Sequence, residues 1–172
     1  YPSFLTELSA LWSLSGAEAG FIGGAFFFGY MVAVPFLSGA TDRVDARRVF
    51  VLSNLLMALG MVGFAFSAHG LWSAAFFQAL SGAGLAGCYM PGLRVLADRV
   101  PHDAGTRHIA FYTSSFGIGT SGALLLAGAL GRHVDWHVAV ALMAIGPLLA
   151  AALVWLRVGH VAPPAAHEAR WL

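Results

Sequence analysis

Long apolar stretches separated by short charged segments dominate the pattern of the chain. Four runs contain no Asp, Glu, Lys or Arg: residues 19–41, 49–93, 109–131 and 136–156. A helix rises about 1.5 Å per residue and the hydrocarbon core of a bilayer is about 30 Å thick, so roughly 20 apolar residues make one crossing. The run 49–93 is therefore long enough for two crossings, and residues 67–70, Ser-Ala-His-Gly, are the natural division.

This pattern predicts an all-α fold, a polytopic transmembrane helix bundle formed by residues 1–157 and followed by a cytoplasmic tail, 158–172. Packed soluble helices would need polar faces opposite their apolar ones, and these stretches are apolar all round. We expect residues 1–5 to be the outer end of an earlier helix that this sequence lacks, and residues 6–16 to form a short external loop. The five expected spans lie near 17–37, 48–67, 71–95, 108–130 and 136–157.

Composition agrees with a protein whose main surroundings are the lipid bilayer. Hydrophobic residues make up 59% of the chain and charged residues 10%, with a mean hydropathy of +0.77. An average globular domain carries about 25% charged residues. The net charge of +1 does not favour nucleic-acid binding. The single cysteine, Cys88, excludes an internal disulfide and a Cys-based metal cluster.

The distribution of arginine predicts the orientation in the membrane. Eight of the nine arginines fall in alternate loops or beyond the last span, and the positive-inside rule assigns that side to the cytoplasm. Trp12, Trp72 and Trp136 fall at the opposite ends of their spans, where an outer aromatic belt is expected. The N-terminus is thus predicted outside and the C-terminus in the cytoplasm.

Small residues recur at four-residue spacing in two of the expected spans. Such stripes let helix backbones approach closely in lipid, so ordinary bundle packing is the first interpretation, and a face that slides during gating is the second. The first stripe comprises Gly16, Gly20 and Gly24, and the second comprises Gly119, Ala123, Ala127 and Gly131.

A charged segment, residues 38–48, lies between the first two spans and reads Ser-Gly-Ala-Thr-Asp-Arg-Val-Asp-Ala-Arg-Arg. Arginines alone would be enough to hold this loop on the cytoplasmic side. That role needs no acidic residue, so Asp42 directly before Arg43 indicates a further role. An Asp at a helix terminus can accept backbone N–H groups and pair with a guanidinium group. Such a pair can hold two helix ends together in one conformation and release them in another.

This segment resembles the loop between helices two and three of the major facilitator superfamily of secondary transporters, which has the pattern Gly-x-x-x-Asp-Arg-x-Gly-Arg-Arg. The pairs Asp42-Arg43 and Arg47-Arg48 match it. Ser38 stands where the first Gly is expected, and Asp45-Ala46 replaces the later Gly, so the basic pair sits one residue further on.

Two further features agree with the resemblance. Residues 78–84, Gln-Ala-Leu-Ser-Gly-Ala-Gly, follow the Arg-x-x-x-Gly-x-Gly pattern of the family's fourth helix, with Gln in place of Arg. After that helix the family often shows an acid, a proline and a basic residue, and this chain has Asp98, Pro101 and Arg107.

The resemblance implies the N-terminal half, helices two to six without helix one, of a bacterial inner-membrane transporter. Such a protein moves a small organic solute by alternating access, together with a C-terminal six-helix half. Asp42, Arg43 and Asp98 would then stabilise the state closed to the cytoplasm. The whole conformational motif on the cytoplasmic side would comprise Asp42, Arg43, Arg47, Arg48 and Asp98.

Polar residues inside the expected spans are the candidates for the solute pathway, because polar side chains in hydrocarbon tend to face the bundle interior. A packing hydrogen bond is the alternative for each of them. The candidates are Gln78, Tyr89 and Arg94 on the helix that the resemblance makes cavity-lining, and Tyr112, Ser115 and Thr120 on the gate helix.

Other chemistry is not favoured by the sequence. His133 and His137 have a spacing that could bind zinc on a helix, but no third strong ligand is near, so no metal site is predicted. Residues 119–122, Gly-Thr-Ser-Gly, match an intramembrane serine-protease motif, yet such a serine needs a membrane-embedded histidine as base. We therefore expect no enzyme and no cofactor. The alternative to a transporter is a non-transporting membrane protein that acts as an assembly partner.

Overall fold

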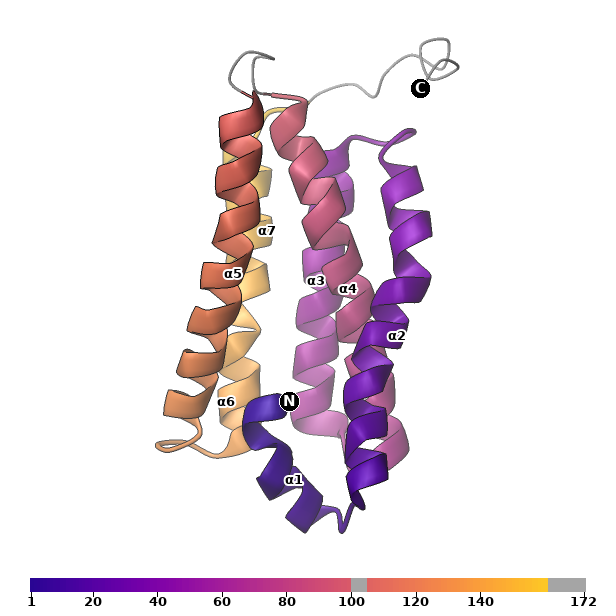
Figure 1. The fold of residues 1–172 in the computed structure, drawn as a ribbon, viewed down its shortest axis with the longest axis vertical. Helices are drawn as coiled ribbons and strands as arrows, with labels where there is room; N and C mark the ends of the chain where they lie inside the picture. The colour runs from indigo at the N-terminus through magenta and orange to yellow at the C-terminus, as the bar shows by residue number, and fades with distance from the viewer. Residues whose placement is uncertain (100–104, 161–172) are drawn as a thin grey trace.

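The computed structural model describes residues 1–99 and 105–160, and every regular element in these residues is helical (Figure 1). This confirms the all-α fold class. The rest of the expected tail, 161–172, and Pro101 lie outside the described residues. The elements are η1 (Pro2–Phe4), α1 (Leu5–Leu11), α2 (Gly16–Ala40), α3 (Ala46–Ser67), α4 (Leu71–Ala97), α5 (Gly105–Leu130), α6 (Trp136–Met143) and α7 (Ile145–Arg157).

Polar caps determine where three of the helices begin. Ser15 accepts a hydrogen bond from the Glu18 backbone N–H, and the Glu18 carboxylate accepts one from the Ser15 N–H, which is a capping box at the start of α2. Asp45 caps α3 through the Arg47 N–H, and Asp135 caps α6 through the His137 N–H. Short polar segments between the apolar runs thus carry the helix-start signals.

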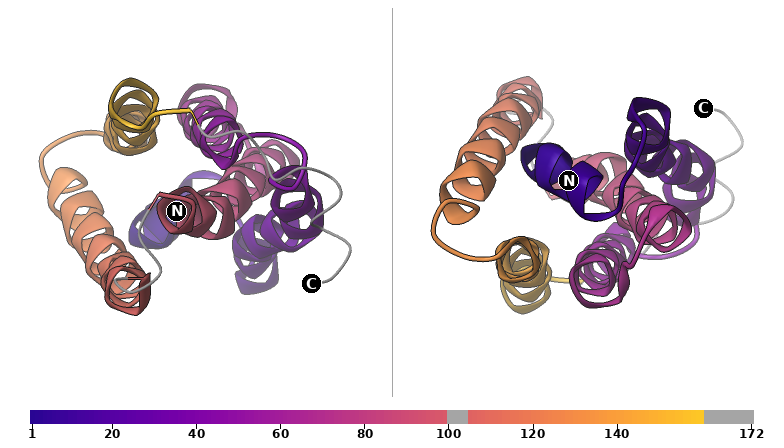
Figure 2. Two further views of the ribbon diagram at one scale, coloured as in Figure 1. Left: turned by 90° about the horizontal axis from the view of Figure 1, so that it is seen from above. Right: turned by 90° about the horizontal axis from the view of Figure 1, so that it is seen from below.

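The central helix, α4, packs against α2 on one side and α3 on the other, and α5 stands at the side of the bundle (Figure 2). Glycines allow these close approaches. A side chain at Gly82 would overlap the backbone of Phe26 in α2, and one at Gly84 would overlap the backbone of Met57 in α3. Gly29 meets the backbone of Ala79 in the same way.

The two predicted small-residue stripes are therefore not the main packing surfaces. No neighbouring atom lies within 4 Å of the position that a Cβ would occupy at Gly16, Gly20, Gly24 or Gly119. The far end of the second stripe is in contact, because Gly131 meets the ring of Phe4. The prediction was wrong for the first stripe because four-residue spacing alone does not show which face of a helix has a neighbour.

Four helical segments are long and apolar enough to cross a membrane: α2, α3, residues 107–130 of α5, and α6 with α7 as one unit. The 27-residue α4 is not among them. Its polar side chains Gln78 and Ser81 are buried between its neighbours, so α4 needs less apolar surface than a helix exposed to lipid. For α4 the membrane crossing stays a prediction.

The first residues differ from the external loop that we expected. Leu5–Leu11 form a short helix whose Leu8 is fully buried, and Phe4 before it is buried as well. The ring of Trp12 lies edge-on to Phe64 and to Trp136, at centroid distances of 6.2 and 5.8 Å. Trp136 therefore belongs to the core and not to an exposed aromatic belt, whereas Trp72 is 75% exposed.

The last predicted span is divided into two helices. α6 ends at Met143 and α7 begins at Ile145, with Ala144 between them in a turn. Pro147 has no N–H to donate to the carbonyl of Met143 four residues earlier, which explains the interruption at this point. The two pieces together still extend from residue 136 to residue 157, as expected.

Candidate functional site

Five helix termini meet at one end of the bundle: the C-terminal ends of α2, α4 and α7 and the N-terminal ends of α3 and α5 (Figure 1). We call this the arginine-rich end, because it carries seven of the described arginines. These are Arg43, Arg47, Arg48, Arg94, Arg99, Arg107 and Arg157. Arg132 lies at the opposite end, after α5.

A first ion-pair cluster at this end joins the end of α2 to the end of α4. Arg94 Nη1 donates to Asp42 Oδ1 at 3.2 Å, and Arg94 Nε donates to Asp98 Oδ1 at 3.3 Å. The Arg94 side chain is 34% exposed and that of Asp42 is 62% exposed. Exposed pairs of this kind contribute at most about 1 kcal/mol to stability, so the cluster orients two helix ends and adds little to the stability of the fold.

Arg94 thus lies in the same cluster as Asp42 and Asp98, although we predicted it from the sequence as a candidate for the solute pathway. Arg43, the expected partner in the motif, is exposed and has no ion-pair partner in residues 1–99 and 105–160.

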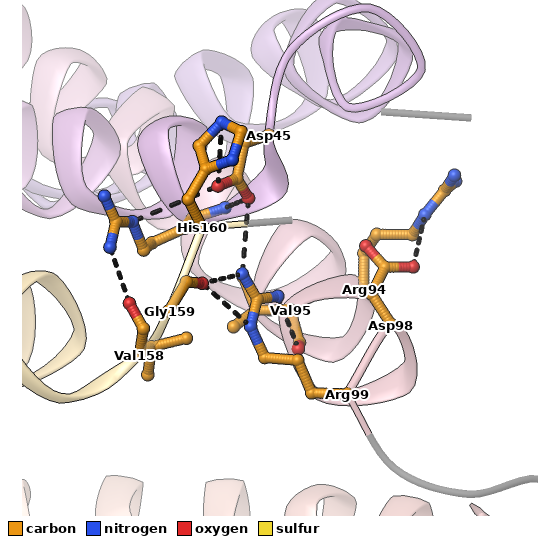
Figure 3. Close-up of polar contacts among 9 residues, drawn as sticks. Asp45, Arg94, Val95, Asp98, Arg99, Val158, Gly159 and His160 are labelled. Carbon is orange, nitrogen blue, oxygen red and sulfur yellow. Dashed lines mark hydrogen bonds and ion pairs between the residues drawn. The ribbon is translucent and has the colours of Figure 1, made fainter. Parts of the chain in front are cut away.

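A second cluster surrounds a buried carboxylate, Asp45 (Figure 3). Its side chain is 1% exposed and lies 3.5 Å from Arg99 Nη2, 4.0 Å from Arg47 Nε and 3.9 Å from His160 Nε2. A buried carboxylate needs counter-charges such as those of Arg47 and Arg99, because the cost of removing it from water is several kcal/mol.

The same two arginines hold the segment that follows α7. Arg47 Nη1 donates to the carbonyl of Val158 at 2.6 Å, and Arg99 Nη2 donates to the carbonyl of Gly159 at 2.6 Å. Arg99 also donates to the carbonyl of Val95 in its own helix. The α2–α3 loop, the end of α4 and residues 158–160 are therefore fastened together around Asp45 (Figure 3).

Sequence reasoning missed Asp45, Arg99 and His160 as members of a site. Asp45 had a readable signal, since an Asp directly before a helical segment is a typical N-cap. Arg99 had no such signal in the sequence, because its partner Asp45 is 54 positions away in the chain.

Two cavities lie beside α2 and α4, and aromatic side chains make up most of the lining of the first and half of the lining of the second. The first, about 240 Å³, is lined by Phe26, Phe27, Tyr30, Leu85, Tyr89 and Phe116. The second, about 280 Å³, shares Phe26 and Phe27 with the first and also reaches Gln78. Gln78 is buried, at 9% exposed, and contributes its amide to an otherwise apolar surface. Two of the candidate pathway residues, Gln78 and Tyr89, therefore line these cavities, and a third, Thr120, lines a separate cavity of about 190 Å³ beside η1.

The three candidates on α5 make hydrogen bonds to backbone carbonyls. The Tyr112 hydroxyl lies 3.0 and 3.1 Å from the carbonyl oxygens of Cys88 and Tyr89 in α4. Ser115 donates to the Tyr112 carbonyl, and Thr120 donates to the Phe116 carbonyl, both within α5. Both of these side chains are exposed. Tyr112 thus links two helices, whereas Ser115 and Thr120 satisfy their hydroxyls locally.

His137, the second residue of α6, has a local partner at the start of its helix. Asp135 accepts a hydrogen bond from the His137 N–H at 3.0 Å and lies 2.8 Å from His137 Nδ1. These two bonds lower the pKa of Asp135 from its ordinary value. The part of the chain that the structure describes holds no group of three or more His, Cys, Asp or Glu residues arranged for a metal ion.

The helices, their apolar surfaces and the charged end define a multi-pass membrane protein. The sequence profile of the Major Facilitator Superfamily matches residues 1–170, and the chain belongs to this family.

Two curated relatives agree with this assignment. The chain is 29% identical to the niacin transporter of Acinetobacter baylyi over 135 residues, which are 78% of the chain and 30% of the relative. It is 28% identical to the gentisate transporter of Corynebacterium glutamicum over 127 residues, which are 74% of the chain and 28% of the relative. The chain thus spans about a third of the length of the curated relatives that it matches.

Proposed function

We propose that these residues form part of a secondary transporter that moves a small organic solute across the bacterial inner membrane by alternating access. The observation that carries this proposal is the Asp42–Arg94–Asp98 cluster, which connects the ends of two helices through exposed ion pairs. Exposed pairs can break and re-form at a cost of about 1 kcal/mol each, which suits a contact that changes in every transport cycle.

In this account the arginine-rich end faces the cytoplasm, and the pairs stabilise the state that is closed on that side. The positive-inside rule supports the orientation. A C-terminal six-helix half would complete the translocation path, and the α2–α3 loop would meet it on the cytoplasmic side. Arg43, which is exposed at this end, is available to that half.

The two aromatic cavities favour a solute with an aromatic ring. Niacin and gentisate, named for the two relatives, are both small aromatic carboxylates. Rings prefer edge-to-face or offset contacts with other rings, which Phe26, Tyr89 and Phe116 can supply, and the Gln78 amide can orient a polar substituent. No described Arg lines either cavity, so a carboxylate would need a cation from elsewhere.

Uptake measurements test this proposal directly. The complete reading frame that contains these residues is expressed in a bacterium lacking its own aromatic-acid uptake, and labelled niacin, gentisate and succinate are supplied separately. We expect uptake of at least one aromatic acid above the vector control, with little uptake of succinate. Protein present in the membrane without uptake of any solute would favour the assembly-partner alternative.

A further inference from the structure

A groove of about 480 Å³ runs between α3 and α7. Its walls include Arg48, Leu52 and Leu55 from α3 and Leu148, Ala152 and Trp155 from α7. The α3 residues that pack against α4, among them Ser53 and Gly60, lie on another face of the helix. The groove therefore opens away from α4, on the outer side of the bundle, where lipid surrounds a membrane protein.

The groove has a polar end and an apolar end. Arg48 lies in the first turn of α3, at the arginine-rich end, and Leu55 lies seven residues further along, about 10 Å deeper at 1.5 Å per residue. Trp155 lies in the last turn of α7, beside Arg48 in the groove wall, and is half exposed. Tryptophan at such a level is typical of the membrane interface.

The rim at the polar end is held in place. The Arg47 guanidinium lies 4.5 Å from the ring centroid of Trp155, and Arg47 also donates to the Val158 carbonyl. Arg48, next in the chain, is exposed and has no ion-pair partner among residues 1–99 and 105–160. Its charge is thus available at the point where the apolar groove reaches the interface.

We propose that this groove binds one anionic diacyl phospholipid, with its phosphate on Arg48 and one acyl chain along Leu52, Leu55 and Leu148. Basic pockets between membrane helices at the interface commonly bind anionic head groups. An apolar helix from a second copy of the chain would cover Arg48 and remove its charge from water without supplying a counter-charge, which is costly. Charge complementarity therefore favours the lipid.

Native mass spectrometry of the full chain tests the site. The protein is purified in detergent with equal amounts of phosphatidylglycerol and phosphatidylcholine, and the ratio of the two retained lipids is measured. R48Q should lower that ratio about fivefold, which corresponds to about 1 kcal/mol for one arginine at the membrane surface. The matched control R43Q removes another exposed charge at the same end but outside the groove, and should leave the ratio unchanged.

A second variant examines the apolar part of the groove. Ala152 is exposed and lines the groove, so A152F fills the space without replacing a buried side chain. It should reduce the retention of both lipids, with elution in gel filtration unchanged.

Equal losses in R48Q and R43Q would show a diffuse charge effect and overturn the proposal. No preference in the unmodified protein, or a lipid-free dimer, would overturn it as well.

Discussion

Two carboxylates only three positions apart behave differently because their burial differs. Asp42 is 62% exposed and pairs with Arg94, whereas Asp45 is 1% exposed and lies among Arg47, Arg99 and His160. An exposed charge can exchange its partner for water, but a buried charge must keep its partners. We therefore propose a role in conformational change for Asp42 and a role in structural support for Asp45.

Asparagine substitutions separate these two roles. In the complete protein, Asp42→Asn should weaken uptake several-fold, because Arg94 loses a charged partner, while the amount of protein in the membrane stays near normal. Asp45→Asn keeps a side chain that can cap α3 but removes the buried charge. It should cost about 3 kcal/mol of stability and lower the melting temperature in detergent. An unchanged uptake in Asp42→Asn would refute its conformational role.

Some of this site was predictable from residues alone. The Asp42-Arg43 and Arg47-Arg48 pairs mark the loop, and an Asp before a helical segment signals an N-cap at Asp45. The partnership of Asp42 with Arg94 was not predictable, because 52 positions separate them and only the packing of α2 against α4 brings them together. Because this packing cannot be read from the sequence, Arg94 was interpreted as a solute contact.

At the scale of the helices, close contact between α2 and α4 depends on single glycines. Gly82→Ala would place a methyl group against the backbone of Phe26, and overpacking of this kind costs about 1–3 kcal/mol. Gly24→Ala is the matched control on α2, because its Cβ would meet no neighbour within 4 Å. Thermal unfolding in detergent should show a lower melting temperature for Gly82→Ala only; equal shifts would contradict this packing.

The helix bounds were predictable to within a few residues because charges and caps delimit the apolar runs. The short helix α1 was missed, since seven residues carry too few periodic positions and the burial of Leu8 depends on distant partners. The break between α6 and α7 had a signal in Pro147, whose ring cannot continue the hydrogen bonding of the preceding turn.

At the scale of the whole molecule, the two ends of the bundle differ in their chemistry. The arginine–aspartate ion pairs lie at one end, and the cluster of Trp12, Phe64 and Trp136 lies at the other. The α2–α3 loop can close the cytoplasmic side only if that end of the bundle faces the cytoplasm. The proposed function therefore depends on this orientation.

Cysteine labelling measures this orientation most directly. In a Cys88→Ala background, Val44→Cys places a thiol in the α2–α3 loop, where Val44 is 38% exposed, and His133→Cys places one at an exposed position of the opposite end. An impermeant maleimide should label His133→Cys in intact cells and Val44→Cys only after the cells are opened. Labelling of Val44→Cys in intact cells would place the α2–α3 loop outside and overturn the proposed orientation.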